Sequence, residues 1–307
     1  MLPSIDIIIV NWNSGRLLPE CIFSINNALQ NSFILNRVVI VDNASSDDSL
    51  DNLDSTNLPL VIIRNTQNYG FAKACNQGAI SSEANFLLFL NPDTRLFKNS
   101  LAEPIKFMMD KENNEIGIIG AQMVDDENNI SRTCSRFPSP FVFVYMSLGL
   151  NRIFPNIFRN QFMTEWDHNN NQVVDQVMGA FFFVRKNLFQ KLNGFDEKFF
   201  VYFEEVDFSF RAKQIDYKSY FLATAKIYHK GGGTSEKVKA LRLFYILQSK
   251  LLYAKKHFTI SGYIFAVLFT FIPEAVIRII DLIFKGKIKS SGEVISAYNM
   301  LIKSLLK

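Results

Sequence analysis

The sequence predicts an α/β protein with a doubly wound, mostly parallel sheet flanked by helices and a helical C-terminal appendage. Between residues 5 and 93, short apolar runs rich in β-branched residues alternate with stretches of helical periodicity. Beyond residue 236 the pattern is helical and basic. With 307 residues, 48% of them hydrophobic, the chain can bury the core of one large domain plus an appendage. We therefore expect a domain at 1–235 and a helical region at 236–307.

The elements follow from these runs. Strands are expected at 5–10, 37–42, 58–65, 85–93, 116–124, 179–186 and 217–229. Helices are expected at 14–29, 70–80 and 197–213, and the segment 131–143, with its two prolines, is expected to be a basic loop. Ligands of doubly wound sheets bind beyond the carboxyl ends of the strands. The polar segments after the first four strands, "NWNS", "DNASSDDS", "NTQNYG" and "NPDT", are thus predicted to share a binding edge.

Charge is divided unevenly along the chain. Residues 231–307 hold 12 of the 33 Lys and Arg but only 4 of the 29 Asp and Glu. A basic region favours an anionic partner such as a membrane surface, a diphosphate lipid or nucleic acid, although a solvated basic helix explains it too. No recognised nucleic-acid-binding module accompanies it, so we expect no nucleic-acid partner.

The strongest apolar stretch, 258–284, is interrupted by Pro273, Glu274, Arg278 and Asp281. Its unbroken part is short for a bilayer span, which favours a pair of interfacial helices. Lysines flank it on both sides: Lys255, Lys256, Lys285, Lys287 and Lys289. The alternative is a helix packed on the first domain. Three widely spaced cysteines and an N-terminus without a signal-peptide pattern predict a cytoplasmic protein.

Two strand-end motifs could bind a nucleotide and a metal. In "VDNASSDDS", Asp42 and Asn43 follow a buried strand and offer polar atoms to a base or ribose, unless the motif is only a helix cap. In "LFLNPDT", Asn91 and Asp93 lie two residues apart, and their oxygens suit Mg²⁺ or Mn²⁺ bound to a diphosphate. The alternative for this second motif is an Asx-Pro turn.

A third motif, "YHKGGGTS", places His229 at a strand end before a glycine-rich loop. Glycines let backbone amides approach phosphate oxygens, so Gly232 and Thr234 are candidates for phosphate or acceptor binding. His229 could complete a metal site with its imidazole neutral, although a single strand histidine is often a core residue. Arg132 and Arg136 in "SRTCSRFPSP" could bind a phosphate or the acceptor, or form surface ion pairs.

The stretch "FFVYFEEVDFSFRAK" holds three carboxylates among aromatic residues. In a helix, Glu204 and Asp207 share a face, Asp207 reaches Arg211 one turn later, and Glu205 points elsewhere. The helix dipole explains carboxylates in a first turn. It does not explain two adjacent glutamates among aromatic side chains. A carboxylate with a raised pKa in such surroundings suits a general base.

Seven motifs in order, "IIIVNWNS", "VIVDNASSDDS", "NYGFAKACNQG", "LFLNPDT", "MGAFFFVRK", "GFDEKFFVYFEEVDFSFRAK" and "HKGGGTS", closely resemble the family 2 glycosyltransferases. Within that family the chain resembles the rhamnosyltransferase-like group of bacterial polysaccharide synthesis. The resemblance covers about residues 4–235. It implies a GT-A fold, a Rossmann-like, mixed and mostly parallel sheet.

Residue by residue, the resemblance implies several roles. Glu205 matches the catalytic base of the family, and Asp93 and His229 match metal ligands. The chain departs from the common pattern with Glu-Glu in place of Glu-Asp, so Glu204 stays an alternative base. It also has Asn91 where many relatives have Asp. The donor site would comprise Asn11, Trp12, Asp42, Asn43, Asn68, Gly70, Asn76, Gly78 and Asn91, and the phosphate or acceptor site Asp207, Arg211, Gly232, Thr234 and Arg136.

The resemblance further implies an inverting, Mg²⁺- or Mn²⁺-dependent transfer from a nucleotide diphosphate sugar. The preferred donor is dTDP-rhamnose, with UDP-sugars as the alternative. The acceptor is expected to be a saccharide linked to a polyprenyl diphosphate at the inner face of the cell membrane. One alternative interpretation is a non-catalytic nucleotide- or carbohydrate-binding protein at the membrane periphery. A second is a nucleotidyltransferase, but "NWNSGRL" is a poor match to the basic, glycine-rich signature that such enzymes usually carry near the first strand.

Overall fold

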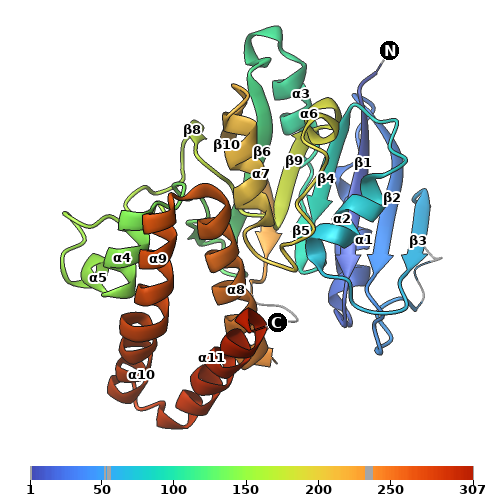
Figure 1. Cartoon of the computed structure of the whole chain (residues 1–307). Helices are drawn as coiled ribbons and strands as arrows, with labels where there is room; N and C mark the ends of the chain where they lie inside the picture. Colours follow the sequence, from blue (N-terminus) through green and yellow to red (C-terminus); the bar gives the residue numbers. More distant parts are fainter. Residues whose placement is uncertain (1, 52, 54–56, 232–237, 307) are drawn as a thin grey trace. The chain divides into compact units, whose positions relative to one another are not determined.

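The computed structural model describes residues 2–51, 53, 57–231 and 238–306. By internal contacts the chain forms two compact units (Figure 1). The sheet unit comprises Met1–Arg136, Thr164–Phe200 and Glu204–Thr234, and the helical unit comprises Phe137–Met163, Val201–Phe203 and Ser235–Lys307. The sequence pattern predicts a boundary at residue 235. The helical unit, however, also includes the two earlier segments Phe137–Met163 and Val201–Phe203.

The sheet unit is built on one mixed sheet whose strand order is β3-β2-β1-β4-β9-β6-β10-β5. β7 pairs with β6, and β8 pairs with β10. β1, β2, β3 and β4 are parallel, and β6 is parallel to β10, while β9 runs antiparallel to both β4 and β6. The strands are β1 Ser4–Asn11, β2 Ile34–Asp42, β3 Leu60–Arg64, β4 Phe86–Leu90, β5 Thr94–Leu96, β6 Ile116–Val124, β7 Ile130–Ser131, β8 Gln172–Val174, β9 Phe181–Arg185 and β10 Lys218–His229.

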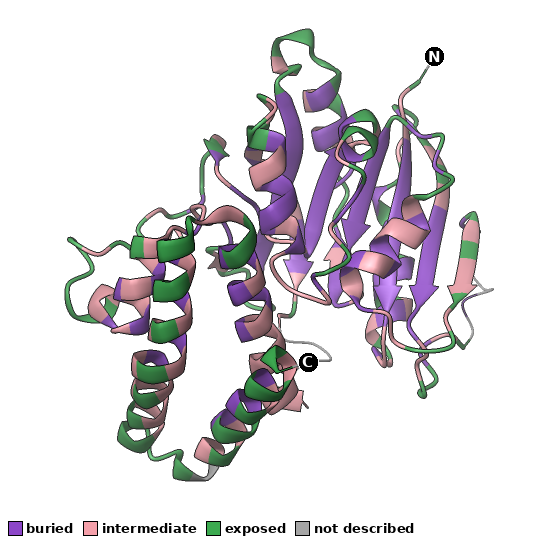
Figure 2. Cartoon of the chain, in the orientation of Figure 1, coloured by how far each residue is buried: buried purple, intermediate pink, exposed green. Residues whose placement is uncertain are grey.

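Helices cover both faces of this sheet. The alternation of side chains along β1 sends Ile5, Ile7 and Ile9 into one core with residues of α1 and α3. Ile8 points to the other face, where it meets α2, and its register partner Phe89 stacks there with aromatic residues that lead to α6 and α7. The central strands are buried along most of their length (Figure 2). The helices are α1 Leu17–Ala28, α2 Phe71–Ala79, α3 Ala102–Met109, η2 Lys111–Asn113, α6 Lys186–Lys191 and α7 Glu204–Lys213.

The fold class predicted from the sequence is confirmed, and two element boundaries are corrected. The segment expected to be a loop up to 143 becomes helical at Pro140, because Ser139 accepts a hydrogen bond from the backbone N–H of Val142 and proline suits a first helical position. The helix expected at 197–213 begins only at Glu204. Tyr202 and Phe203 have φ angles of 67° and 68°, which a right-handed helix does not allow.

The helical unit has its own apolar core. Phe143, Leu247, Leu251 and Leu301 are buried together in it. A polar cluster accompanies the core: Glu274 accepts hydrogen bonds from Lys250 at 2.6 Å and from Arg278 at 2.7 Å. Its elements are α4 Pro140–Ser147, α5 Leu150–Ile153, α8 Lys239–His257, α9 Ile260–Phe269, the π-helical turn η4 Thr270–Glu274, α10 Ala275–Phe284, η5 Ile288–Ser290 and α11 Ser291–Leu305.

Residues 260–284 form one continuous helix rather than the expected pair. Pro273 lies inside the π-helical turn, where the wider turn accommodates a residue without a backbone N–H, so the helix continues past it. Among the described residues, Ile260–Phe284 is the one helix that is long and apolar enough to cross a membrane by length and composition, with a mean hydropathy of 2.0. Length therefore does not exclude a span, contrary to the expectation from the sequence.

Candidate active site

The carboxyl ends of β1, β2 and β3 lie side by side. Asn11, Asp42 and Arg64 are register partners across these strands. The Asn11 Nδ2 donates to Asp42 Oδ1 at 2.8 Å, and the Ser45 hydroxyl donates to the same oxygen at 2.6 Å. Asp42 is buried, and Trp12 is half-buried next to Asn11 in the chain. The first two predicted strand-end motifs thus form one polar edge, held together by their own side chains.

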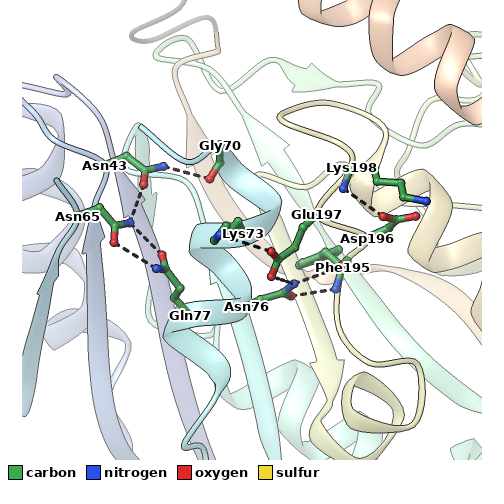
Figure 3. A network of polar contacts seen from close by, with 10 residues as sticks. All are labelled: Asn43, Asn65, Gly70, Lys73, Asn76, Gln77, Phe195, Asp196, Glu197 and Lys198. Carbon is green, nitrogen blue, oxygen red and sulfur yellow. Dashed lines mark hydrogen bonds and ion pairs between the residues drawn. The ribbon is translucent and has the colours of Figure 1, made fainter. Parts of the chain in front are cut away.

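A chain of amide side chains leads from this edge to α2 (Figure 3). Asn43 Nδ2 donates to the carbonyl oxygen of Gly70 at 3.1 Å, and Asn65 Nδ2 donates to Asn43 Oδ1 at 2.9 Å. Asn65 and Gln77 exchange two further hydrogen bonds. Asn43 therefore holds the loop before α2 in place. Asn65 belongs to the predicted edge segment "NTQNYG", but its pairing with Gln77 was not expected, because an amide after a strand carries no signal of its partner.

Glycine is required at two positions of the predicted nucleotide loop and helix. Gly70 has a φ of 90°, and a Cβ there would clash with the carbonyl oxygen of Phe200. Asn68 accepts a hydrogen bond from the Gly70 N–H at 2.9 Å and shapes the same turn. At Gly78 a Cβ would clash with Ile8, so α2 lies directly on β1.

The Asn76 side chain forms its hydrogen bonds with other residues of the sheet unit. Its Nδ2 donates to the carbonyl oxygen of Phe195 at 2.9 Å, and its Oδ1 accepts from the Phe195 N–H at 2.9 Å (Figure 3). The Nδ2 also lies 3.2 Å from Glu197 Oε1. Asn76 thus ties α2 to the loop that precedes α7. This geometry favours a positioning role over the nucleotide contact expected from the resemblance.

Asp93 and His229 are brought together by the antiparallel pairing of β5 with β10, in which His229 faces Thr94. Asp93 Oδ1 lies 3.5 Å from His229 Nε2, and the two side chains are 10% and 12% exposed. Asn91 lies at the start of the same turn, with its N–H bonded to Ala180. One carboxylate and one imidazole at a strand edge fit a divalent ion that takes its other ligands from phosphates and water. In the described part of the chain, no group of three or more His, Cys, Asp or Glu side chains could hold a metal ion by itself.

The two glutamates of α7 have different surroundings. Glu204 is 4% exposed, and its Oε2 finds no hydrogen-bond partner among the described residues. Burial, together with the neighbouring charge of Glu205, raises the pKa of Glu204 well above its ordinary value. Glu205 is half-buried, and its side chain lies against Gly179. Burial thus favours the neutral form of Glu204, and Glu205 is the less buried glutamate of the pair.

Glu205 lies at the same edge of the sheet as the metal motif. Gly179 precedes β9, whose first residue, Phe181, pairs with Leu90 at the end of β4. The N–H of Asn91 donates to the carbonyl oxygen of Ala180 at 3.0 Å. The antiparallel β9 therefore brings Gly179, and with it Glu205, beside the turn that carries Asp93. The position of Gly179 next to the Glu205 side chain was not predicted, although Gly179 stands in the quoted "MGAFFFVRK" motif.

The expected phosphate or acceptor role of Asp207 and Arg211 does not fit their contacts. Arg211 Nε donates to Asp207 Oδ2 at 2.8 Å, and Asp207 is fully buried. The other guanidinium nitrogens donate to the carbonyl oxygens of Leu192 at 2.7 Å and Gly194 at 2.9 Å. Because these donors already bind the turn before α7, we assign the pair to holding that turn.

The two basic residues of the 131–136 segment also bind within the sheet unit. Arg132 donates to the carbonyl oxygen of Thr164, and Arg136 forms an ion pair with Glu165. The ion pair is partly exposed, so a phosphate could compete for Arg136. Gly232 and Thr234 lie outside the described residues.

These features can be compared with known proteins. The family described as "Glycosyl transferase family 2" matches residues 6–207, about two-thirds of the chain. The chain belongs to glycosyltransferase family 2. The matched range includes Asp42, Asp93 and both glutamates of α7, so the polar edge described above lies inside the region that this family shares.

Curated relatives of this glycosyltransferase support the rhamnosyltransferase type. A low-salt glycan biosynthesis hexosyltransferase, Agl10 of Haloferax volcanii, is 25% identical over 70% of this chain and 63% of its own length. The N-acetylglucosaminyl-diphospho-decaprenol L-rhamnosyltransferase of Mycobacterium tuberculosis is 21% identical over 75% of this chain and 76% of its own. The rhamnosyltransferase WbbL of Escherichia coli is 29% identical over 42% of this chain and 46% of its own.

Solved structures confirm the GT-A fold of the glycosyltransferase. A mannosyltransferase from Pyrobaculum calidifontis, in complex with GDP-mannose and Mn²⁺, aligns with a TM-score of 0.57 at 15% identity, covering 98% of this chain and 88% of its own. TarS of S. aureus, truncated to 1–349, aligns with a TM-score of 0.53 at 14% identity, covering 97% and 91%. At this identity the likeness shows the fold alone.

Proposed function

We propose that the protein is an inverting glycosyltransferase in which Glu205 is the general base. The observation that carries this proposal is the position of Glu205 on α7, half-buried against Gly179 and beside the turn that holds Asp93. A half-buried carboxylate, partly shielded from water, suits proton abstraction from a sugar hydroxyl.

In the proposed reaction Glu205 takes the proton of an acceptor hydroxyl as that oxygen attacks the anomeric carbon of the donor. A new carbon–oxygen bond forms on one face while the bond to the nucleoside diphosphate breaks on the other. One displacement inverts the configuration, and the leaving diphosphate carries away the bonding electron pair. Glu204 stays protonated beside Glu205, so a second negative charge does not compete for the proton.

A divalent ion, Mg²⁺ or Mn²⁺, is the proposed cofactor, and Asp93 and His229 are the residues that would hold it. Their 3.5 Å approach at a sheet edge supports this assignment. Relatives in fold were crystallised with Mn²⁺, the P. calidifontis mannosyltransferase and GalNAc-T7 among them. When bound, such an ion supplies positive charge that stabilises a departing diphosphate.

The proposed donor is dTDP-rhamnose. Two curated relatives are named rhamnosyltransferases, which supports this sugar. UDP-linked sugars are the alternative donor class, since another relative is named only as a hexosyltransferase. The nucleotide would lie at the edge formed by Asn11, Trp12 and Asp42, where Trp12 could stack on the base.

The proposed acceptor is a saccharide carried on a polyprenyl diphosphate, and the proposed location is the cytoplasmic face of the membrane, in surface polysaccharide synthesis. The name of the M. tuberculosis relative includes a decaprenol-linked diphosphate sugar, which supports an acceptor of this class. Arg136, the partly exposed cation of the 131–136 segment, is a candidate contact for its diphosphate.

Thermal unfolding with UDP, dTDP, GDP and CMP, each with and without Mn²⁺, tests the donor and metal together. A nucleotide at about one hundred times its dissociation constant adds roughly 2.7 kcal/mol to the free energy of unfolding. We expect a manganese-dependent rise with dTDP or UDP that Asp93→Ala removes. A rise without manganese dependence would contradict the metal site, and no rise with any nucleotide would contradict the donor site.

The Glu205→Gln variant tests the base. We expect transfer to fall by about 10²–10⁴-fold, the range of general base catalysis, while the thermal shift with nucleotide is retained. Glu204→Gln is the matched control, because it replaces a carboxyl that is already neutral, and it should keep most of its activity. If Glu204→Gln lost transfer and Glu205→Gln kept it, the two roles would be exchanged. A wild-type protein that binds the nucleotide but releases no nucleoside diphosphate from donor and acceptor would be a binding module. If transfer is measurable and neither change affects it, neither glutamate is the base.

A further inference from the structure

One side of the helix Ile260–Phe284 is apolar and exposed over its whole length. The exposed positions recur at spacings of three or four residues, with two adjacent pairs, and Ile272, at the middle, is 64% exposed. Only 17% of the most apolar 18-residue window of this helix is buried. We call the exposed set the apolar strip; it comprises Ile260, Ile264, Phe265, Leu268, Ile272, Val276, Ile280, Ile283 and Phe284. A strip of this length exceeds what a soluble surface usually exposes.

The rotation of the helix is set by polar contacts on its inner side. Glu274 binds Lys250 of α8 at 2.6 Å, and the Tyr298 hydroxyl of α11 donates to the carbonyl oxygen of Thr270 at 3.1 Å. Burial alone would raise the pKa of Glu274, but the charges and hydrogen bonds of Lys250 and Arg278 outweigh it and hold that pKa below its ordinary value. The ionised cluster anchors the inner side, so the apolar strip stays on the outside.

A second exposed apolar group lies next to this helix. It lies on α4, α5 and the residues after α5, and Ile157 is its most exposed member at 74%. Arg152 of α5 forms an ion pair with Asp281 of α10 at 3.0 Å, and a Cβ at Gly262 would come within 2.8 Å of Pro140. These contacts place the group alongside α9 and α10, all within the helical unit. We call it the apolar knuckle: Phe141, Ile153, Phe154 and Ile157.

Basic residues stand at both ends of the strip. Lys255 and Lys256 precede it, and Lys285 and Lys287 follow it directly; all four are exposed. Lysines beside an apolar helix face are complementary to the phosphates of anionic lipids, whose negatively charged surface attracts them. A protein partner would need a matching acidic rim, whereas a bilayer offers both the apolar layer and the negative surface.

We propose that the apolar strip and the apolar knuckle together form a surface that docks flat on an anionic lipid bilayer, with the helix 260–284 parallel to the membrane. This deepens the proposed function, because it gives the glycosyltransferase a means of staying at the surface that would present a lipid-linked acceptor. Docking itself requires neither donor nor acceptor, so it can be tested apart from transfer.

A flat orientation follows from where the charges lie. At 1.5 Å per residue the 25-residue helix is about 38 Å long, which would reach across a hydrocarbon core of about 30 Å. Glu274 lies near the middle of the helix, however, and Arg278 and Asp281 follow in the same half. A spanning helix would carry this charged cluster into the hydrocarbon, where charges are strongly disfavoured. With the helix lying flat, the cluster stays on the protein side and the strip enters the lipid.

Vesicle flotation tests the surface. We expect the full-length protein to bind phosphatidylglycerol-containing vesicles at low salt and to bind pure phosphatidylcholine vesicles more weakly. Replacing Leu268 and Ile272 with Glu should reduce binding at least tenfold, and replacing Phe154 and Ile157 with Glu should reduce it by a smaller factor. The matched control is Ile80→Glu, an exposed apolar residue of the sheet unit (85% exposed), which should leave binding unchanged.

Each result of this test bears on the proposal. Loss of binding in both strip and knuckle variants, with thermal unfolding as in the wild type, supports the two-part surface. Unchanged binding in the strip variant would overturn it. If the wild type binds no vesicles and sediments as a dimer that the strip variant breaks, the surface is an interface between copies of the chain. Nucleotide-induced thermal shifts should be the same in all variants, so failure here is distinguishable from failure of the transferase assignment.

Depth measurements with a nitroxide label test the orientation. Single cysteines at positions 264, 272 and 284 can be labelled selectively, because native Cys21, Cys75 and Cys134 are buried and burial raises their pKa. Flat docking predicts similar depths at all three positions, about 5–10 Å into the headgroup and acyl boundary. A label at 272 much deeper than those at 264 and 284 would show a spanning helix and overturn the flat orientation.

Discussion

Glu204 and Glu205 are neighbours in the chain, yet their surroundings differ. Glu204 is buried and has a raised pKa, whereas Glu205 lies half-buried against Gly179. Burial, and after it the neighbouring charge of Glu205, disfavours ionisation of Glu204. The sequence left the choice of base open between them, and burial is the physical reason to prefer Glu205.

The raised pKa of Glu204 predicts a pH dependence of stability. The folded state keeps a proton on Glu204 that the unfolded chain releases above its ordinary pKa, given as 4.5. The free energy of unfolding therefore falls as the pH rises above about 4.5, by at most about 1.4 kcal/mol per unit for one proton, until the folded-state pKa is passed. In Glu204→Gln this contribution is absent, so the stability of the variant relative to the wild type should increase from pH 5 to pH 8. Urea unfolding at several pH values measures it, and a constant difference would show that Glu204 is ionised in the fold.

At the scale of elements, the edge of the sheet is assembled by contacts between helix α2 and the loop before α7. Asn76 binds both backbone polar groups of Phe195, and Arg211 binds the carbonyl oxygens of Leu192 and Gly194 (Figure 3 shows the Asn76 contacts). Gly194, with a φ of 71°, has no room for a Cβ next to Asn76. Side chains from two helices thus fix one loop. Because α7 comes after this loop in the chain, the loop also helps to position the glutamates of α7.

We predict that Asn76→Ala lowers the free energy of unfolding by about 1–3 kcal/mol, because it leaves backbone groups of the buried Phe195 without their partners. Lys73→Ala on the same helix is the control. Lys73 forms a 4.0 Å ion pair with Glu197, between side chains that are 42% and 48% exposed, and lies 4.8 Å from the centre of the Tyr69 ring. Because exposed contacts of this kind contribute little, a smaller change is expected than for Asn76→Ala. Denaturant unfolding and nucleotide titration separate the roles of Asn76. Weaker nucleotide binding with unchanged stability would restore it to the donor site.

At the scale of the whole molecule, the helical unit is assembled from distant parts of the chain. α4 contributes Phe143 to the core that Leu247, Leu251 and Leu301 form with it. Within residues 137–163, Phe143 therefore depends on the C-terminal helices for its buried apolar partners. The chain cannot be divided at 235 without exposing that core.

We predict that deletion of 236–307 yields a protein that aggregates. Removal of these residues uncovers Phe143 and the rest of the buried face of α4, a contiguous apolar surface. Sedimentation velocity and binding of a hydrophobic dye measure the effect. The control is the full-length chain with the Glu substitutions of the apolar strip, which remove exposed rather than buried residues and should remain soluble. A monodisperse truncated protein would show that residues 137–163 find their partners elsewhere.

Some of this architecture can be read from local sequence patterns. Runs such as "IDIIIV" and "RVVIVD" predict strands because their alternation and β-branching are local properties, and the polar residues after them predict the binding edge. The structure has β1, β2, β4, β6 and β10 where these patterns expect strands. The pairing of Asp93 with His229 follows less directly, because it depends on the antiparallel contact of β5 with β10, and β5 has three residues and no clear signal.

The sequence by itself determined the class of the fold, the strand-end motifs and the glutamate pair, because these depend on residue types at short spacings. Only the tertiary structure decided which glutamate is buried, that Asn76 and Arg211 bind the loop before α7, and that α4 belongs with the C-terminal helices. Such partnerships join residues far apart in the chain. These contacts depend on which surfaces pack against each other in the folded protein. The local periods of two residues in strands and 3.6 residues in helices do not encode that pairing.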